Sequence, residues 1–313
     1  MVTIEDVTAA AGRIGPYLRR TPLLPVRCTK TNPFPDGELC LKLECLQVTG
    51  SFKPRGAVSK LRSLDGATLA RGIVTASGGN HGLATAYAGW LAGVRTAVFV
   101  PENVSPDKRK KLAQWGAEVV VQGRHWDEAN REALALSERE GMTYFHPFAD
   151  PAVIAGQGTL ALEILEQAPD IDMILVGIGG GGLISGIAVA AKARKPSLRI
   201  IGIEPVGAPT LHACLAAGRI VTLPGITTRV PTFAALRTEP INFEIVRRHV
   251  ERIVLITDEA MSEAARWLWF EMGIAADLSG AAAIAALQSG AIRPPAGLHV
   301  CALVCGAGPD GLV

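Results

Sequence analysis

Residues 172–186 have the sequence DMILVGIGGGGLISG. The β-branched run at 172–176 predicts a buried strand, and residues 183–195 have the apolar period of a helix. Glycine destabilises regular structure, so four in a row indicate a tight turn or a main chain that approaches a ligand closely. N–H groups at the start of a helix bind anions, and we therefore interpret Gly179, Gly180, Gly181 and Gly182 as a phosphate cradle.

The same alternation of strand and helix extends in both directions along the chain. Downstream strands are expected at 199–204, 252–256 and 299–304, and helices at 258–272 and 279–289. Upstream strands are expected at 72–76, 95–100, 118–121 and 142–145, and helices at 80–93, 106–115 and 126–140. This pattern predicts an α/β fold with two open, mostly parallel twisted sheets flanked by helices.

The upstream units are compact enough to form a separate body. We expect residues 1–69 plus 149–313 to form a large domain and residues 70–148 a small domain inserted in it. The strand at 38–43 and the first helix, which Thr3 and Asp6 would cap, have no partners of their own and should join the large domain. The cleft between the two domains is the expected ligand site.

Composition narrows the functional class. The chain has 313 residues, of which 49% are hydrophobic and 19% charged, and this argues against disorder. The chain has 31 basic and 29 acidic residues, and because these charges nearly balance, no nucleic-acid or membrane partner is expected. The six cysteines show no CxxC spacing, so no metal finger is expected. The first residues lack the features of a signal peptide, and we expect a cytoplasmic protein with reduced thiols.

Residues 49–57, TGSFKPRGA, place a lysine where a helix begins. A cation is unfavourable at that end of the helix dipole. The dipole and the neighbouring Arg55 are expected to lower the pKa of Lys53 and favour a nucleophilic amine. The alternative is a solvated lysine in an ordinary first turn.

Two further segments follow strands. In residues 75–82, TASGGNHG, a glycine turn opens a helix and could cradle a carboxylate, with Asn80 offering an amide to a second polar group. In residues 304–308, VCGAG, Cys305 ends the last strand, where open α/β sheets place ligands. The alternatives are an ordinary capped turn and a buried core cysteine.

The glycine run also satisfies the dinucleotide pattern GxGxxG, with Glu204 at the end of the following strand. A nicotinamide oxidoreductase is therefore a rival interpretation. The pattern is weak alone, and it leaves the lysine and asparagine segments unexplained.

Taken together, the four segments resemble the fold-type II pyridoxal-phosphate enzymes, and most closely their serine/threonine dehydratase branch. The resemblance runs from about Arg20 to the end of the chain and implies an architecture like the tryptophan synthase β-subunit. It implies that Lys53 carries pyridoxal 5'-phosphate covalently, with Phe52 beside the ring. It further implies that Asn80 binds the phenolic oxygen, that the four glycines and Leu183 hold the phosphate, and that Cys305 faces the pyridine nitrogen.

The resemblance also implies a substrate site and a reaction. Ser77, Gly78, Gly79 and His81 would bind the substrate carboxylate, and Gln157, in the family-like stretch 151–159, would lie nearby. The implied reaction is β-elimination of L-threonine or L-serine to a 2-oxo acid and ammonia, with Lys53 as general base. A thiol at the pyridine nitrogen would make the ring a weaker electron sink than a carboxylate would.

The chain departs from the family pattern at several positions. Serine racemases have a serine acid at the position of Gly78, so two-base racemisation is not expected. Metal-activated members pair the acid matching Glu204 with an Asp where this chain has Thr210, so no metal is expected. The usual Glu-Pro-Ser-Gly-Ala is replaced here by residues 277–281, DLSGA, and the usual Ala-Asp-Gly is absent from 227–236.

These departures leave alternatives open. The substrate could be a relative such as a hydroxyaspartate, a phenylserine or a biosynthetic intermediate, or the reaction could be β-replacement on the same fold. A non-catalytic protein that binds the cofactor is a further alternative. The resemblance also implies a homodimer.

Overall fold

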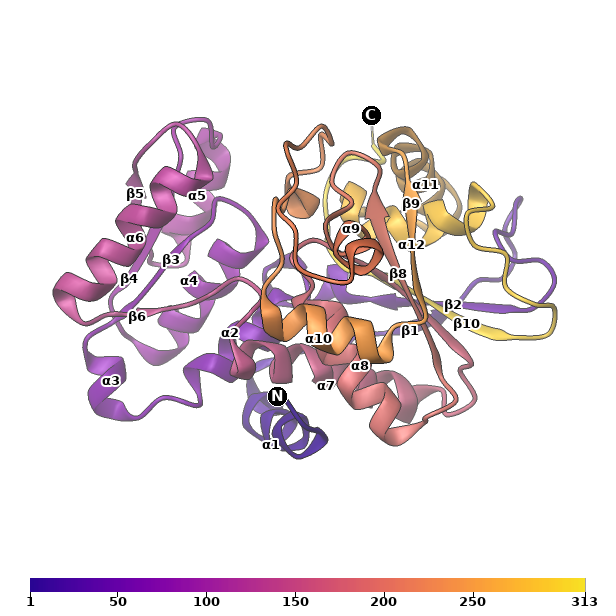
Figure 1. Cartoon of the computed structure of the whole chain (residues 1–313), viewed down its shortest axis with the longest axis horizontal. Coiled ribbons are helices and arrows are strands. Elements are labelled where there is room, and N and C mark those ends of the chain that lie inside the picture. Colours follow the sequence, from indigo (N-terminus) through magenta and orange to yellow (C-terminus); the bar gives the residue numbers. More distant parts are fainter. Residues whose placement is uncertain (313) are drawn as a thin grey trace.

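The computed structural model describes residues 1–312, which contain two separate sheets with helices packed around them (Figure 1). The six-stranded sheet has the order β1 (Leu23–Pro25), β2 (Glu38–Leu43), β10 (His299–Val304), β7 (Met173–Gly177), β8 (Arg199–Pro205), β9 (Arg252–Ile256). The four-stranded sheet has the order β5 (Glu118–Val121), β4 (Thr96–Val100), β3 (Ile73–Ala76), β6 (Thr143–Tyr144). All pairs are parallel except β1 with β2, which confirms the expected fold class.

The helices alternate with the strands along the chain. They are α1 (Ile4–Ile14), α2 (Lys53–Leu61), α3 (Gly66–Ala70), α4 (Asn80–Ala92), α5 (Pro106–Gln114), α6 (Trp126–Glu140), α7 (Pro151–Gln167), α8 (Gly182–Arg194), α9 (Thr210–Ala217), α10 (Pro240–His249), α11 (Asp258–Met272) and α12 (Leu278–Gln288). Short 3-10 turns occur at η1 (Gly15–Tyr17), η2 (Glu44–Leu46), η3 (Val48–Gly50) and η4 (Pro231–Phe233). Thr3 and Asp6 cap α1 reciprocally, as predicted.

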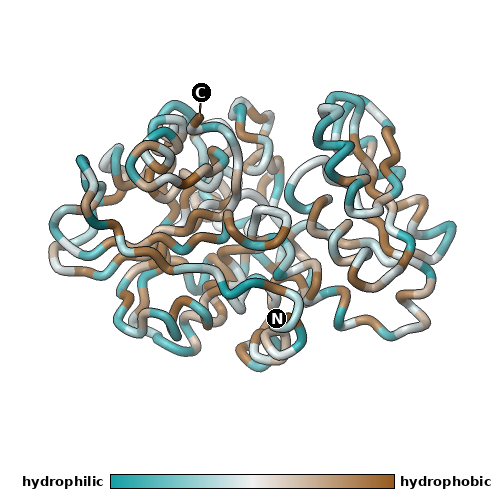
Figure 2. The backbone as a smooth tube through the Cα atoms, turned by 180° about the vertical axis from the view of Figure 1, so that it is seen from behind, coloured by the Kyte–Doolittle hydropathy of each residue, from teal (hydrophilic) through white to brown (hydrophobic). Residues whose placement is uncertain are grey.

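The large sheet is covered on both faces because successive residues of its strands point to opposite sides. Met173 and Leu175 of β7 pack with α11 and α12, whereas Ile174 and Val176 pack with α1, α7, α8 and α10. Figure 2 shows that apolar residues are concentrated along these central strands. Both faces are buried, which explains why the strands have nearly continuous apolar sequences.

The four-stranded sheet is likewise enclosed by helices. Val74 and Ala76 pack against α6, and Ile73 packs with apolar residues of α2 and α4. The segment from residue 145 to residue 150 then leads from β6 into α7, which contacts α2 and α8. This connection passes between the two sheets and carries several residues of the candidate site.

Candidate functional site

Lys53 is the first residue of α2 and lies at the carboxyl end of the last strand, β10. The turn before it contains Thr49 (φ +64°) and Gly50 (φ +84°), two left-handed residues that reverse the chain. Ser51 then forms a β-bridge with Gly306, and the N–H of Phe52 donates to the carbonyl of Cys305 over 3.1 Å. The lysine segment is thereby attached to the segment that contains Cys305, 252 residues further along.

The amine of Lys53 has no acidic partner among the described residues. Its Nζ donates to the carbonyl oxygen of Pro147 over 2.8 Å and lies 5.3 Å from the centre of the Phe52 ring. Removal from water lowers the pKa of Lys53 to about 8, and the Cys305 thiol opposes this shift. A lysine with this pKa is uncharged in roughly one molecule in ten at pH 7, far more often than an ordinary lysine, and the neutral amine is the nucleophilic form.

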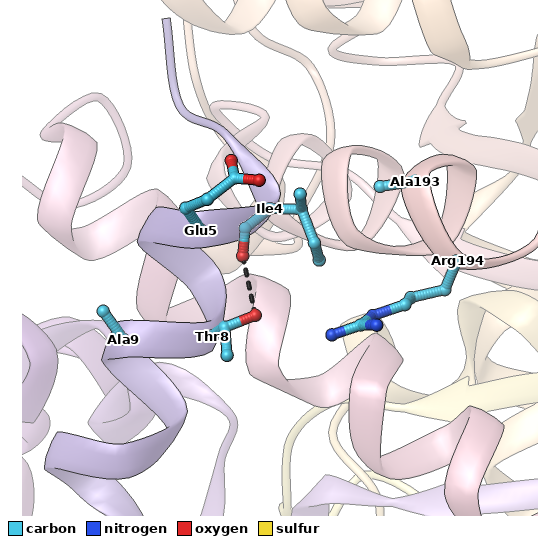
Figure 3. Close-up of a pocket in the computed structure, with 6 residues that line it drawn as sticks. All are labelled: Ile4, Glu5, Thr8, Ala9, Ala193 and Arg194. Atoms are coloured by element: carbon cyan, nitrogen blue, oxygen red, sulfur yellow. Dashed lines mark hydrogen bonds between the residues drawn. The ribbon is translucent and has the colours of Figure 1, made fainter.

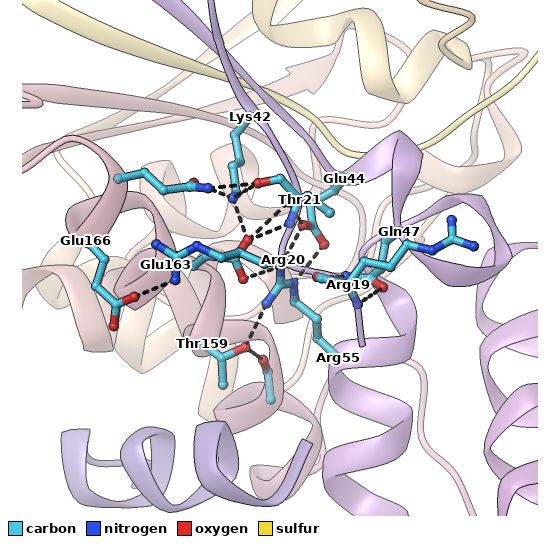
Figure 4. Close-up of polar contacts among 12 residues, drawn as sticks. Arg19, Arg20, Thr21, Lys42, Glu44, Gln47, Arg55, Thr159, Glu163 and Glu166 are labelled. Atoms are coloured by element: carbon cyan, nitrogen blue, oxygen red, sulfur yellow. Dashed lines mark hydrogen bonds and ion pairs between the residues drawn. The ribbon is translucent and has the colours of Figure 1, made fainter. Parts of the chain in front are cut away.

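Arg55 does not lower the pKa of Lys53, and that part of the prediction is wrong. The Arg55 guanidinium is buried and binds two carboxylates, Glu44 at 2.7 Å and Glu163 at 2.9 Å. Lys42 binds Glu163 from another side at 2.6 Å, so two cations and two anions balance (Figure 4). The positive charge of Arg55 is neutralised within this network, which fixes α2 against α7.

The glycine loop between β7 and α8 is packed too tightly for side chains. A Cβ at Gly180 would lie 2.3 Å from the Phe148 ring, one at Gly179 would lie 2.6 Å from the Thr232 carbonyl, and Gly181 has φ +100°. Within residues 1–312, the N–H groups of Gly180, Gly181, Gly182 and Leu183 have no hydrogen-bond acceptor. The loop therefore presents free donors at a helix N-terminus, the arrangement that binds a phosphate.

Pro147 and Phe148 connect this loop with the lysine. Pro147 accepts the hydrogen bond from Lys53, and the Phe148 ring packs on Gly180. The Nδ1 atom of His146 accepts from the N–H groups of Phe148 (3.2 Å) and Ala149 (2.9 Å), which orients the segment. Burial lowers the pKa of His146 to about 4, so its ring is neutral. These residues have no motif of their own, so the sequence did not indicate that they belong to the site.

The loop before α4 is also shaped by its glycines. A Cβ at Gly78 would lie 2.5 Å from the side chain of Val104, and one at Gly82 would lie 2.0 Å from the Ser77 carbonyl. The hydroxyl of Ser77 accepts from the N–H of Gly79 over 3.3 Å. His81 is turned inward, with Nε2 2.9 Å from the Phe145 carbonyl, and burial lowers its pKa to about 3. A ligand at this loop would meet the main chain of His81, not its imidazole.

Asn80 contacts Asp277, and the sequence did not indicate that these two residues lie side by side. Nδ2 of Asn80 donates to Oδ2 of Asp277 over 3.4 Å, although 197 residues separate the two. Oδ1 of Asp277 accepts from Ser279, whose hydroxyl lies 3.9 Å from the sulfur of Cys305. Burial raises the pKa of the Cys305 thiol, which is therefore protonated at neutral pH. A continuous polar chain thus connects Asn80 with Cys305.

Two other predicted residues lie behind these loops. Gln157 is buried in α7, and its Nε2 would lie 2.4 Å from a Cβ at Gly56, so it packs against α2. Glu204 accepts from the N–H groups of Leu211 (2.8 Å) and His212 (2.9 Å) and so binds the start of α9. The described residues contain no group of three or more His, Cys, Asp or Glu side chains that could hold a metal ion.

A surface hollow between α1 and α8 does not belong to this site. It is lined by Ile4, Thr8 and Arg194, among others, and the Thr8 hydroxyl already donates to the Ile4 carbonyl (Figure 3). The residues around Lys53 therefore form the candidate active site.

Among the helices of residues 1–312, none combines the length and apolarity needed to cross a membrane.

Comparison with known proteins places the chain in a family. Residues 14–306 match the family model described as pyridoxal-phosphate dependent enzyme. The L-threonine ammonia-lyase of Thermotoga maritima is 36% identical over 287 residues, which cover 92% of this chain and 71% of that protein. The phenylserine dehydratase of Ralstonia pickettii is 35% identical over 311 residues, which cover 98% of this chain and 94% of that protein.

A solved structure gives the same answer at the level of the fold. The structure of maize serine racemase superposes with a TM-score of 0.93 at 33% identity, covering 98% of this chain and 93% of that one. Family model, relatives and structure agree over nearly the whole chain. The protein belongs to the family of pyridoxal-phosphate-dependent enzymes of fold type II.

Proposed function

We propose that the protein is a pyridoxal-phosphate-dependent ammonia-lyase that removes the hydroxyl and amino groups of a small β-hydroxy amino acid, L-threonine or L-serine. The products would be a 2-oxo acid and ammonia. The bound cofactor supplies the electron sink that stabilises negative charge at the substrate α-carbon. The threonine ammonia-lyase and phenylserine dehydratase among the relatives support elimination as the reaction.

The residues around Lys53 fit the cofactor. The amine of Lys53, which has no acidic partner within the described residues, suits covalent attachment, and the glycine loop has free N–H donors and no room for side chains. In this proposal Gly179 to Gly182 and Leu183 hold the phosphate, and Phe52 lies beside the ring. Asn80 contacts the phenolic oxygen and Cys305 the pyridine nitrogen.

The same proposal assigns the substrate site and the proton transfer. Ser77, Gly78, Gly79 and the main chain of His81 would bind the substrate carboxylate. Once displaced from the cofactor, Lys53 would accept the α-proton at Nζ. Gln157 would support this face through its packing against α2 and not through direct contact with the substrate.

Gly78 is the observation that favours elimination over racemisation. A two-base racemase needs a second proton donor on the face opposite Lys53, and a glycine cannot supply one. A side chain at this position would also meet Val104 at 2.5 Å from its Cβ. His81, the nearest other titratable residue along the chain, is bound to the Phe145 carbonyl. Lys53 would therefore act as the single base.

Three further features belong to this proposal. Residues 1–69 plus 149–313 would form the large cofactor-binding domain, and residues 70–148 the small one. The active form would be a homodimer, and its location the cytoplasm. Limited proteolysis, light scattering and cell fractionation test these points separately.

The direct test is spectroscopic. The purified protein with added pyridoxal phosphate should show a Schiff-base absorption band, and borohydride reduction should leave a pyridoxyl group on the peptide that contains Lys53. Failure to show a band at saturating cofactor would refute the assignment. Binding of NAD in place of pyridoxal phosphate would instead support the dinucleotide interpretation.

A substrate assay then identifies the reaction. Release of 2-oxo acid and ammonia should be measured with threonine, serine, hydroxyaspartate and phenylserine, with and without an added thiol nucleophile. We expect oxo-acid release that the nucleophile does not divert. Diversion to a thioether product would indicate β-replacement, and exchange of the α-hydrogen with inversion and no oxo acid would indicate a racemase.

A further inference from the structure

Asp277 is the acidic residue that contacts the proposed cofactor site most directly, and it immediately precedes α12. Its two carboxylate oxygens face different partners. Oδ1 accepts from the Ser279 hydroxyl (2.7 Å) and the N–H of Gly280 (2.6 Å), and Oδ2 accepts from Nδ2 of Asn80 (3.4 Å). The carboxylate thus joins the start of α12, which packs on β10 and β7 of the large sheet, to the start of α4, which packs on β3 and β4 of the small sheet.

The hydrogen bond between Ser279 and Asp277 determines the direction of the hydrogen bond between Ser279 and Cys305. A hydroxyl has one proton, and Ser279 donates it to Asp277. Its oxygen is then an acceptor 3.9 Å from the sulfur of Cys305, and the single thiol proton can turn either to this oxygen or to a pyridine nitrogen at the proposed site. Asp277 is therefore the acceptor at which the contacts from Asn80 and from Cys305 converge.

The main chain after Cys305 packs closely against the side chain of Asp277. A Cβ at Gly306 would lie 2.6 Å from Oδ2 of Asp277, and a Cβ at Gly308 would lie 2.7 Å from its Cβ. The N–H of Asp277 also donates to the Gly306 carbonyl over 3.0 Å. The two glycines leave room for an acidic side chain that larger residues would displace.

We propose that Asp277 is a positioning residue that fixes the Asn80 amide on one side and the Ser279–Cys305 pair on the other. In the proposed function, on which this inference rests, Asn80 would contact the phenolic oxygen of the cofactor and Cys305 its pyridine nitrogen. One carboxylate would then determine both polar contacts to the ring and, through them, its electron distribution.

The charges near Asp277 argue against a purely stabilising role. Within the described part of the chain, no Lys, Arg or His forms an ion pair with it. The titratable groups that interact with it are Asp310 and the thiols of Cys45 and Cys305. Burial raises the pKa of Asp277, although Ser279, Gly280 and Asn80 oppose the shift. An enclosed carboxylate without a cation relies on its hydrogen bonds to offset the cost of burial, and the raised pKa of Asp277 indicates that they do so only in part.

Its second role, as the N-cap of α12, does not require a charge. Asn caps a helix about as well as Asp does. The variant Asp277→Asn keeps an oxygen for Ser279 and Gly280 but turns an NH₂ group toward the NH₂ group of Asn80. The substitution therefore preserves the cap and disrupts the contact with Asn80.

The test compares Asp277→Asn with Asp310→Asn. Asp310 is the nearby carboxylate that accepts from the N–H of Leu278 over 3.0 Å and contacts neither Asn80 nor Ser279. Three measurements are made on each protein. They are the dissociation constant for pyridoxal phosphate, the absorption band of the bound cofactor against pH, and the unfolding midpoint of the apoprotein against pH.

We expect Asp277→Asn to weaken cofactor binding about tenfold or more, the size expected for loss of a hydrogen bond to a charged group, and to shift the band and its pH dependence. The apoprotein should become more stable at neutral pH. The parent loses stability as pH rises from the ordinary pKa of Asp through the raised pKa of Asp277, and the variant lacks this loss. Asp310→Asn should leave the cofactor band and affinity unchanged.

Other results would overturn the inference. An Asp277→Asn holoenzyme with the parental band and affinity would show that Asp277 only caps α12. An apoprotein that is destabilised at neutral pH would show that the charged carboxylate stabilises the fold, which contradicts a role confined to positioning. Should this variant not fold, Ser279→Ala tests the other arm and should shift the band in the same direction by less, and an unshifted band would count against the proposal. A parent protein without any cofactor band would refute the proposed function itself.

Discussion

Two lysines near α2 have opposite surroundings, although neither side chain is fully exposed: Lys42 is buried and Lys53 is partly buried. Lys42 of β2 is fully buried, and its Nζ donates to Glu163 (2.6 Å), Gln167 (2.7 Å) and the Thr21 carbonyl (2.8 Å). Lys53 donates to one carbonyl, that of Pro147. All three donor positions of the Lys42 ammonium have acceptors, whereas within residues 1–312 the Lys53 ammonium has one acceptor and no counterion.

The difference indicates that Lys42 serves the stability of the fold, whereas Lys53 is available for chemistry. Around Lys42, the charges of Glu44, Arg55 and Glu163 balance and every member has partners, so the ammonium form is retained despite the burial that lowers its pKa. Around Lys53, the lack of an anion keeps the amine ready to lose its proton. Four predictions test this contrast, beginning with the largest expected effect.

Replacement of Lys53 should abolish turnover without harming the fold. Lys53→Ala removes the covalent anchor and the general base, and we expect oxo-acid release to fall by about a thousandfold or more. Because the variant also loses an unpaired amine, the apoprotein should be at least as stable as the parent. Activity and urea unfolding measured on the same preparation check both parts. Turnover that persists in the parent protein after borohydride treatment would contradict the role of Lys53.

Replacement of Lys42 should have the reverse effect. Lys42→Met leaves Glu163 with Arg55 as its only cation and should cost about 3 kcal/mol of unfolding free energy, as expected when one partner of a buried ion pair is removed. Turnover per folded molecule should change by less than about twofold, since this lysine does not contact the proposed site. Urea unfolding and an active-site titration measure the two quantities. A loss of turnover in folded protein would mean that the network also acts in catalysis.

The pH dependence of apoprotein stability should reveal the unpaired lysine. The pKa of Lys53 is lowered from 10.5 to about 8, so the folded state binds fewer protons than the unfolded state between these values. Stability should therefore rise with pH across this window, by an amount on the order of 2 kcal/mol. Lys53→Met should remove this rise, while Lys42→Met should keep it. Identical profiles for parent and Lys53→Met would show that the amine titrates normally.

The same contrast explains which parts of the site the sequence revealed. Lys53 and the glycine loop belong to local motifs. The four glycines indicate an anion cradle, and the lysine motif is compatible with a nucleophile or with a solvated lysine until it is combined with the other segments. The proximity of Asn80 and Asp277 depends on the order of strands in two sheets, and no local pattern encodes it. The orientation of Arg55 likewise depends on Glu44 and Glu163, so proximity in sequence gave the wrong cause for the pKa of Lys53.

Secondary structure shows a similar division. Ser105-Pro106 correctly predicted the start of α5, and its hydroxyl accepts from the N–H of Lys108. Asp150-Pro151 is the same signal and begins α7, yet we interpreted that stretch only through its family resemblance. The threonine- and proline-rich residues 221–240 predict a long connecting loop, and in the structure this stretch contains only the short turn η4 before α10 begins at Pro240.

The smallest effect is expected at the exposed edge of the Lys42 network. Arg20 and Glu166 form an ion pair of 2.8 Å, but their side chains are 57% and 63% exposed. Water screens such a pair, and fixing two long side chains costs entropy, so Arg20→Ala should change the unfolding free energy by no more than about 0.5 kcal/mol. The comparison with Lys42→Met, whose bond to Glu163 is of similar length, then isolates burial as the variable. Both substitutions could instead lower the unfolding free energy by the same amount, at low and at high salt. Burial would then not change the strength of these ion pairs, and the contrast between Lys42 and Lys53 would lose its electrostatic basis.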